Sequence, residues 1–317
     1  MIRIVVDKDI PYVQGVLERV AQVSYLSPDE ITASSVREAD ALFIRTRTKV
    51  DSSLLAGSKV RFVATATIGF DHIDADYCRQ QGVRWVSCPG CNAQAVCDYV
   101  EEAISSLKAG EQHLTIGVVG YGHVGKLVAA MAERKGYKVL LSDPPLGIGL
   151  SLEELAPQCD VLTFHTPLSM EGEYATYHLC NEAILRACKS DALIINAARG
   201  GVVDEQALID RLSMPDCQLM TAIDCWEKEP EVNAKLVQLV DLASFHIAGY
   251  SIEGKMNASE MCLDAFCEFF SLAILSINKK VVPLQGDSEP GWLKRLSEQL
   301  KAAPEQFEQL RKQYKLR

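Results

Sequence analysis

Three polar residues in the second half of the chain each follow an apolar, strand-like run. Arg199 comes after ALIINAA, Glu229 shortly after LMTAID, and His246 ends LASFH. The carboxyl ends of parallel strands form the ligand-binding edge of an open α/β sheet, so these side chains should share one edge. Imidazole can take a hydroxyl proton near neutral pH, a guanidinium can hold a carboxylate at two points, and a carboxylate can orient the imidazole. The set predicts hydride transfer from a hydroxy acid, with His246 as the base.

A glycine-rich segment, GYGHVG from Gly120 to Gly125, follows the strand-like run TIGVV and opens the helical run HVGKLVAAMAERKG. In such a unit Gly120 allows the tight turn, Gly122 lets a pyrophosphate approach the backbone and Gly125 lets the helix pack closely. The helix N-terminus attracts the phosphate charge. Asp143 ends the next strand-like run, where it can bind ribose hydroxyls and would repel a 2′-phosphate. The segment predicts NAD as the cofactor, with His123 beside it as a loop residue.

The segment RTRTK, from Arg45 to Lys49, concentrates three positive charges and two hydroxyls after a strand-like run. In an acidic chain this cluster is a candidate grip for a phosphate or carboxylate, and a solvated loop is the alternative. Asp71 and His72, in GFDHID, lie where a helix is expected to begin. We interpret Asp71 as the N-cap of that helix and the pair as mainly structural.

The composition is that of an ordinary globular protein. The 317 residues are 48% hydrophobic and 23% charged, and this length suggests about two domains. A net charge of -10 argues against a nucleic-acid surface, which needs a basic face. No signal peptide and no apolar run long enough to span a bilayer are expected. Eleven cysteines without a secretion signal predict reduced thiols and a cytoplasmic protein. The C-x-x-C pair Cys88 and Cys91 has no second pair to complete a zinc site, so we expect no metal.

Strand-like runs alternate with helical runs along most of the chain, which predicts parallel sheets covered by helices. A long helical run over 92–110 separates two such series, and a second long helix, from near Ile252, returns the chain to the first domain. The first series comprises strand-like runs at 2–6, 23–26, 41–45, 60–65 and 83–87, with helical patterns over 11–20 and 71–81.

This organisation predicts an α/β fold with two doubly wound parallel-sheet domains and a cleft between them. Residues 1–95 and 250–283 should form a flavodoxin-like substrate domain, and residues 96–249 a Rossmann NAD domain inserted within it. Residues 284–317 should form a short C-terminal helical tail.

The segments INAARGGVVDEQAL, AIDCWEKEP and FHIAGY resemble the signature of the D-isomer-specific 2-hydroxyacid dehydrogenases. This resemblance implies that Arg199, Glu229 and His246 are catalytic. Glu227 competes for the middle role, and the Glu-Pro pair selects Glu229. Further segments are similar to a branch of this family that oxidises 4-phospho-D-erythronate to 2-oxo-3-hydroxy-4-phosphobutanoate in pyridoxal 5′-phosphate biosynthesis. They are RTRTKV, FVATATIGFDHID, CPGCNAQAV, LTFHTPL, AARGGVVD and HIAGYSIEGK.

The resemblance also implies binding residues and an assembly. Substrate contacts are expected from Thr46, Thr67 and Tyr250, with positive charge from Arg45 and Lys49. A homodimer is expected, although the tail is shorter than the dimerisation region of that branch, which PEQFEQLRKQY resembles in part. The full set of expected cofactor-binding residues is Gly120, Gly122, His123, Val124, Gly125, Asp143, Thr166, Ala197, Ala198, Arg199, Asp224 and Gly249.

Two other functions stay open at this point. A relative that acts on 3-phosphoglycerate would share the fold and the catalytic set, and differs only in the substrate-side segments. A non-catalytic NAD-sensing protein would share the fold, but it would have no need to keep Arg199, Glu229 and His246 together.

Overall fold

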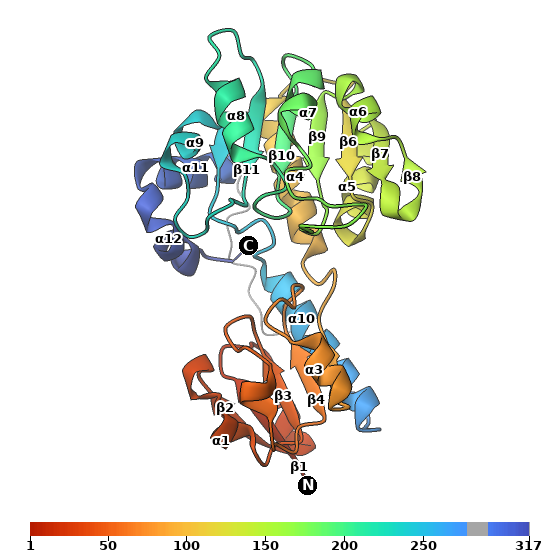
Figure 1. The fold of residues 1–317 in the computed structure, drawn as a ribbon, viewed down its shortest axis with the longest axis vertical. Coiled ribbons are helices and arrows are strands. Elements are labelled where there is room, and N and C mark those ends of the chain that lie inside the picture. The colour runs from red at the N-terminus through yellow and green to blue at the C-terminus, as the bar shows by residue number, and fades with distance from the viewer. Residues whose placement is uncertain (278–290, 317) are drawn as a thin grey trace. The chain divides into compact units, whose positions relative to one another are not determined.

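A computed structural model describes residues 1–277 and 291–316, which fall into two compact units (Figure 1). Unit one consists of Met1–Asn92 and 251–277, and unit two of Ala93–Tyr250 and 291–316. The long helix α4 (Ala93–Leu107) begins unit two, and the long helix α10 (Ile252–Phe269) belongs to unit one. The described part of the C-terminal tail belongs to unit two.

Unit one is built on a five-stranded parallel sheet with the order β2-β1-β3-β4-β5, the flavodoxin-like arrangement expected from the sequence. Alternate residues of β1 enter different cores: Ile4 and Val6 pack on the α10 side and Val5 on the other. Both faces are therefore covered, which explains why the strands lack polar alternation. The strands are β1 (Ile2–Asp7), β2 (Ala21–Leu26), β3 (Ala41–Ile44), β4 (Phe62–Thr65) and β5 (Arg84–Val86).

Two helix predictions in unit one need correction. The segment 11–20 is not a helix but a series of turns with one 3-10 turn, Leu17–Arg19, because Tyr12 and Gly15 adopt left-handed backbone angles (φ 66° and 77°). The helix expected over 71–81 is shorter, α3 (Ala75–Gln80), and its N-cap is Asp74 rather than Asp71. The remaining helices of this unit are the single turns α1 (Ala33–Val36) and α2 (Ser52–Leu55).

Unit two contains a seven-stranded sheet with the order β12-β11-β10-β9-β6-β7-β8. All its strand pairs are parallel except β7 with β8, and the strand order reverses between β6 and β9, as in a Rossmann fold. The strands are β6 (Thr115–Val119), β7 (Lys138–Asp143), β8 (Ile148–Gly149), β9 (Val161–Phe164), β10 (Leu193–Asn196), β11 (Met220–Ile223) and β12 (Leu242–Ala243).

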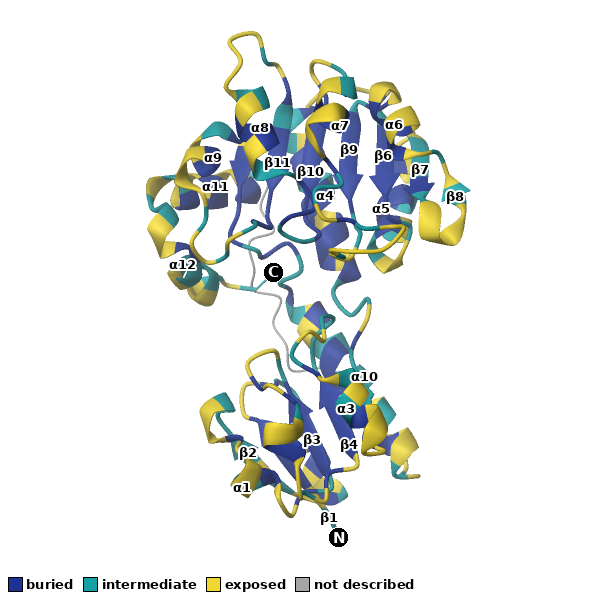
Figure 2. Cartoon of the chain, viewed as in Figure 1, coloured by how far each residue is buried: buried dark blue, intermediate teal, exposed yellow. Residues whose placement is uncertain are grey.

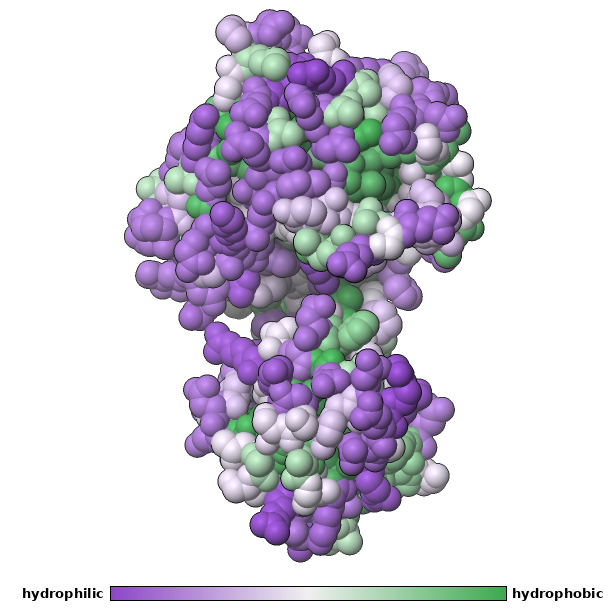
Figure 3. Space-filling model, in the orientation of Figure 1, coloured by the Kyte–Doolittle hydropathy of each residue, from purple (hydrophilic) through white to green (hydrophobic). Residues whose placement is uncertain are grey.

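The helices of unit two bury one side against this sheet and expose the other (Figure 2). Apart from α4, those that connect the strands are α5 (His123–Arg134), α6 (Leu152–Leu155), α7 (Glu182–Ala187), α8 (Glu205–Leu212) and α9 (Ala234–Leu239). Hydrophilic residues dominate the face of each unit seen in Figure 3. Within the described residues, none of the helices has the length and apolar character required to cross a membrane.

The tail forms α11 (Trp292–Ala302), which packs against the β12 edge of the unit-two sheet, and α12 (Phe307–Gln313), which packs against α11. Leu293 and Leu300 of α11 are fully buried. The hydroxyl of Ser297 accepts a hydrogen bond from the amide of Ala243, at 2.9 Å, and so satisfies a backbone donor of this edge strand. The tail is therefore part of the core of unit two.

Candidate active site

A histidine–glutamate pair lies just beyond the end of β12. Nδ1 of His246 is 2.7 Å from Oε2 of Glu229, and the side chain of His246 is about one-third exposed (34%). The other carboxylate oxygen of Glu229 accepts a hydrogen bond from the backbone amide of Trp226, at 3.0 Å. Because both oxygens are engaged, Glu229 holds the imidazole in one orientation while the ring stays accessible.

A buried aspartate shapes the turn that carries His246. Asp224 is only 1% exposed, and its carboxylate accepts hydrogen bonds from the amides of Ile247 and Ala248 and from the hydroxyl of Ser244. The backbone oxygen of Asp224 accepts from the amide of His246, which has a left-handed φ of 57°. A non-glycine residue in this region needs such support. Asp224, expected near the cofactor, is thus also the brace of this turn.

The turn after β10 brings Arg199 against the segment that carries Glu229. The side chain of Asn196 donates hydrogen bonds to the backbone oxygens of Arg199 (3.0 Å) and Cys225 (3.4 Å). A Cβ at Gly200 would overlap the carbonyl oxygen of Trp226, so only glycine permits this close approach. The ends of β10 and β11 are tied together here, and the three expected catalytic residues follow neighbouring strands of one sheet.

The pKa of His246 is raised well above its ordinary value. The sulfur of Cys225 and the carboxylate of Glu229 favour the imidazolium, and together they outweigh the burial that opposes it. Burial also raises the pKa of the Cys225 thiol. Cys225 directly follows the strand-like run LMTAID, but no feature of the sequence selects it, because a cysteine in an apolar run usually acts as a small hydrophobe.

The alternative glutamate, Glu227, belongs to a different cluster. Its Oε1 is 2.9 Å from Nε2 of His178, whose Nδ1 lies 3.3 Å from Asp204. Glu227 also exchanges backbone-to-carboxylate hydrogen bonds with Glu205. The geometry therefore agrees with the choice of Glu229 as the partner of His246.

Two groups of possible metal ligands occur among the described residues, Cys225 with Glu229 and His246, and His178 with Asp204 and Glu227. In each group the ligand atoms lie within 4.8 Å of one another. The histidine and carboxylate atoms of each group already contact one another, which accounts for their closeness without an ion.

The glycine loop has the geometry that a dinucleotide requires. Gly120 has a φ of 90°, and a Cβ there would lie 2.7 Å from the backbone oxygen of His165. A Cβ at Gly125 would overlap the carbonyl oxygen of Gly120, whereas no atom lies within 4 Å of such a Cβ at Gly122. The N-cap residue of helix α5 is Gly122, which has no side chain to cap the helix. The first turn of α5 has no acidic residue, so the N-terminus of the helix is open to a phosphate.

Residues around this loop also fit NAD. Asp143 accepts a hydrogen bond from the amide of Tyr121, at 2.6 Å, which places its carboxylate beside the glycine loop. At the switch point of the sheet, the Thr166 hydroxyl and Nδ1 of His165 are buried without a hydrogen-bond partner among the described residues. Burial lowers the pKa of His165 to about 3 and keeps it neutral. Unpartnered buried polar atoms at a switch point are what a polar ligand would satisfy.

In unit one, the basic loop after β3 is less free than the sequence suggested. Arg45 donates to both oxygens of Asp7, at 2.9 and 3.2 Å, and to Asp9, at 2.6 Å. Lys49 is 79% exposed and lies 2.9 Å from Asp51. Arg47 is exposed and has no ion pair with another described residue. Arg45 thus helps to fix the loop. The accessible positive charge of the loop lies mostly on Arg47 and Lys49.

The hydroxyl residues of unit one form a short network after β4. Oγ1 of Thr67 is 2.6 Å from Oγ1 of Thr65, which is 3.0 Å from Nε2 of His72. Burial lowers the pKa of His72. The hydroxyl of Thr48 is buried without a partner among the described residues, and Thr46 beside it is exposed.

The thiol of Cys88 is buried and lies 3.5 Å from that of Cys262 in α10. Cys88 therefore packs against α10.

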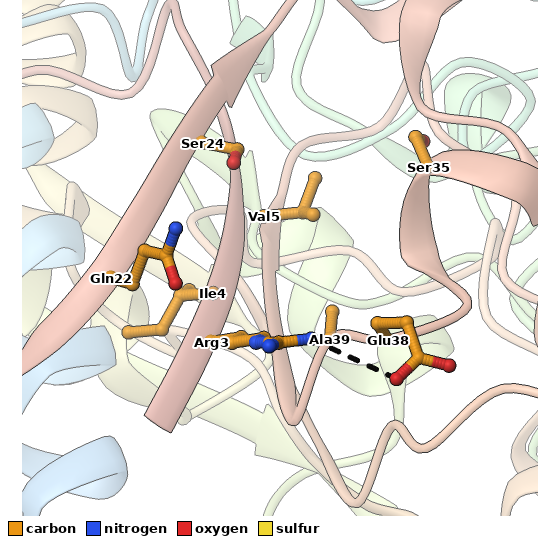
Figure 4. Close-up of a pocket in the computed structure, with 8 residues that line it drawn as sticks. All are labelled: Arg3, Ile4, Val5, Gln22, Ser24, Ser35, Glu38 and Ala39. Atoms are coloured by element: carbon orange, nitrogen blue, oxygen red, sulfur yellow. Dashed lines mark ion pairs between the residues drawn. The ribbon is translucent and has the colours of Figure 1, made fainter. Parts of the chain in front are cut away.

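Figure 4 shows a pocket of about 210 Å³ in unit one, away from the carboxyl ends of the strands. Its lining includes the amino-terminal half of β1, and an ion pair of 3.7 Å joins Arg3 to Glu38 across it. Ligands of parallel α/β sheets bind at the carboxyl ends of the strands, so this pocket is not the candidate site.

Comparisons with known proteins agree with this geometry. Residues 100–248 match the NAD-binding domain of the D-isomer specific 2-hydroxyacid dehydrogenases. An erythronate-4-phosphate dehydrogenase of Bacteroides fragilis is 40% identical over 339 aligned positions, covering 99% of this chain and 96% of the relative. That of Cronobacter sakazakii is 38% identical, with 99% and 91% covered. The structure of NAD-bound 3-phosphoglycerate dehydrogenase from Entamoeba histolytica is 25% identical, with a TM-score of 0.71 over 85% of this chain and 95% of that one.

Proposed function

This chain belongs to the D-isomer specific 2-hydroxyacid dehydrogenase family, and from that premise we propose that its substrate is 4-phospho-D-erythronate. It is an NAD-dependent dehydrogenase, and the proposed product is 2-oxo-3-hydroxy-4-phosphobutanoate, an intermediate of pyridoxal 5′-phosphate biosynthesis. The pairing of His246 with Glu229 at 2.7 Å, next to the turn of Arg199, is the observation that carries the chemistry. The substrate assignment is supported by the relatives from Bacteroides fragilis and Cronobacter sakazakii. Both are named erythronate-4-phosphate dehydrogenase, and each alignment covers 99% of this chain.

In the proposed mechanism His246 is the proton acceptor. When its Nδ1–H is donated to Glu229, the neutral ring keeps a lone pair on Nε2, which takes the proton of the C2 hydroxyl. Glu229 then stabilises the imidazolium. Arg199 binds the substrate carboxylate and polarises the forming carbonyl. NAD, when bound, supplies the acceptor for the hydride that leaves C2.

The glycine loop and the neighbouring strand ends are proposed to hold NAD. The open face of Gly122 and the uncapped start of α5 suit the pyrophosphate, and Asp143 suits the adenosine ribose. Asp224 would act mainly through the turn that it braces. The other proposed contacts are Gly120, His123, Val124, Gly125, Thr166, Ala197, Ala198, Arg199 and Gly249.

Substrate contacts are proposed for Thr46, Thr67 and Tyr250. Lys49 would add positive charge for the phosphate. Arg45 would contribute less directly, since Asp7 and Asp9 already share its guanidinium.

The test is the absorbance of reduced nicotinamide with purified protein, NAD and 4-phospho-D-erythronate, compared with 3-phosphoglycerate and unphosphorylated erythronate. Cofactor that co-purifies is measured separately, because it would limit the signal to one turnover. Selective reduction with 4-phospho-D-erythronate is expected. Reduction with 3-phosphoglycerate alone would overturn the substrate assignment and keep the chemistry, whereas no reduction with any of the three would overturn both.

A cytoplasmic location and a homodimeric assembly are part of the same proposal. All eleven cysteines are free thiols, which suits a reducing compartment. Analytical ultracentrifugation of the purified protein tests the dimer, and a monomer at micromolar concentration would contradict it.

A further inference from the structure

An arginine of the C-terminal tail contacts the carboxylate that orients His246. Nη1 of Arg311, in α12, lies 3.6 Å from Oε2 of Glu229, the same oxygen that is 2.7 Å from Nδ1 of His246. Nη2 of Arg311 lies 3.2 Å from Glu308 in the same helix. Arg311 is partly buried (29% exposed), and Glu229 is more so (18%). One carboxylate oxygen is therefore shared between the imidazole and a guanidinium.

The tail is held firmly enough to keep Arg311 there. Phe307, at the start of α12, is fully buried. Tyr314, just beyond α12, packs edge-on against Phe245, with ring centres 6.1 Å apart, and Phe245 directly precedes His246. Helix α11 adds the hydrogen bond of Ser297 to the edge strand β12. The tail thus contacts the strand, the turn and the carboxylate that together place His246.

We propose that Arg311 is a positioning residue of the dehydrogenase reaction, which shares Glu229 with His246 and thereby sets the pH at which His246 exchanges its proton. This inference rests on the proposed role of His246. The sequence resemblance gave the tail only a part in dimerisation.

The direction of the effect follows from the charges around His246. Glu229 favours the imidazolium, and the sulfur of Cys225 does so from another side. Arg311 is a cation paired with Glu229, and its positive charge offsets part of the stabilisation that Glu229 gives to the imidazolium of His246. Without Arg311, the carboxylate would favour the imidazolium more strongly, and His246 would lose its proton at higher pH. Because the guanidinium is partly exposed, solvent and salt weaken the effect.

Lys312 provides a matched control. It neighbours Arg311 in α12, carries the same charge and also lies near Glu308, at 3.5 Å, but its ammonium is not paired with Glu229. It is 59% exposed. Arg311→Gln and Lys312→Gln therefore each remove one positive charge from α12. Only Arg311→Gln removes a cation that is paired with Glu229.

The experiment follows the ring signals of the histidines by NMR as a function of pH in the cofactor-free protein and its variants. The chain has only six histidines, and His246→Gln assigns the signal of His246. We expect Arg311→Gln to raise the titration midpoint of His246 by about half a pH unit at low salt. Lys312→Gln should leave it unchanged, Arg311→Lys should restore most of the original midpoint, and high salt should shrink the difference.

An unchanged midpoint in Arg311→Gln, or an equal shift in Lys312→Gln, would overturn the proposal. If Arg311→Gln does not fold, Arg311→Met, which removes the charge and keeps an apolar stem, takes its place in the same titration, and an unchanged midpoint in that variant would overturn the proposal. The titration needs no substrate, so its outcome is independent of the assignment of 4-phospho-D-erythronate. In an active preparation, the acid limb of kcat/KM should move with the NMR midpoint.

Discussion

Unit two contains two histidine–glutamate pairs that look alike and differ in what they can do. His246 with Glu229 and His178 with Glu227 have similar contacts, 2.7 and 2.9 Å, and both histidines have a left-handed φ, 57° and 52°. Yet His246 faces a carboxylate through Nδ1 alone, whereas His178 faces Glu227 through Nε2 and Asp204 through Nδ1.

A short distance to a carboxylate therefore does not by itself make a histidine a base. A neutral imidazole has one N–H and one lone pair, so His246 can satisfy Glu229 and still accept a proton. His178 has a carboxylate at each ring nitrogen, so neither nitrogen is open to a substrate proton. His178 is therefore suited to joining three chain segments, and His246 to proton transfer.

The largest expected effect separates the two histidines. His246→Gln should lower kcat by about 10²- to 10⁴-fold, because the general base is lost. His178→Gln should lower kcat less than about tenfold but reduce the free energy of unfolding by about 1–2 kcal/mol, because one amide cannot replace both of its contacts. Steady-state kinetics and urea unfolding of both variants measure this. A comparable loss of kcat in the two variants would contradict the distinction between the two histidines.

The next effect separates the two glutamates. Glu229→Gln keeps a hydrogen-bond acceptor for Nδ1 but removes the charge that stabilises the imidazolium, so kcat should fall by about 10²-fold and the acid limb of the pH profile should move to lower pH. Glu227→Gln, a matched change two residues earlier, should leave the limb in place. If Glu227→Gln shifts the limb instead, the roles of the two glutamates have been exchanged.

Much of this arrangement could be predicted from the sequence, because it depends on local order. The strand ends that carry Arg199, Glu229 and His246, and the turn at Gly120, follow from apolar runs and glycine spacing within short segments. The Glu-Pro resemblance chose Glu229 over Glu227, and the contact with His246 agrees.

The rest depends on contacts between distant residues, which periodicity does not record. Arg45 appeared to be a free cation, but Asp7 and Asp9, at the end of β1, engage it from 38 and 36 positions away. The contact of Arg311 with Glu229 joins the tail to a turn in the middle of the chain. The prediction of a helix over 11–20 was wrong for a local reason. The spacing of apolar residues does not reveal the left-handed backbone angles at Tyr12 and Gly15.

The pH dependence should have opposite signs in the two reaction directions. Oxidation needs neutral His246, so kcat/KM for the hydroxy acid should rise about tenfold per pH unit below the raised pKa of His246 and level off in the alkaline range. Reduction of the keto acid needs the imidazolium, so it should be level at neutral pH and fall as pH rises through the same value. Profiles in both directions measure this, and two limbs at clearly different pH values would exclude one shared group.

The smallest effect concerns Cys225, the neighbour that distinguishes the surroundings of His246 from those of His178. The sulfur of Cys225 contributes to the raised pKa of His246, but burial keeps its thiol protonated, so it acts on the imidazole as a hydrogen-bond partner and not as a full charge. Cys225→Val, which keeps an apolar side chain of similar size, should therefore move the acid limb of oxidation to lower pH by only about half a unit. Below the limb, oxidation should then be about threefold faster at a given pH. Cys217→Val is the control, since Cys217 precedes β11 and so lies at the opposite end of that strand from Cys225. If the limb stays in place in Cys225→Val, Glu229 and the Arg311 beside it set the proton affinity of His246 without a contribution from Cys225.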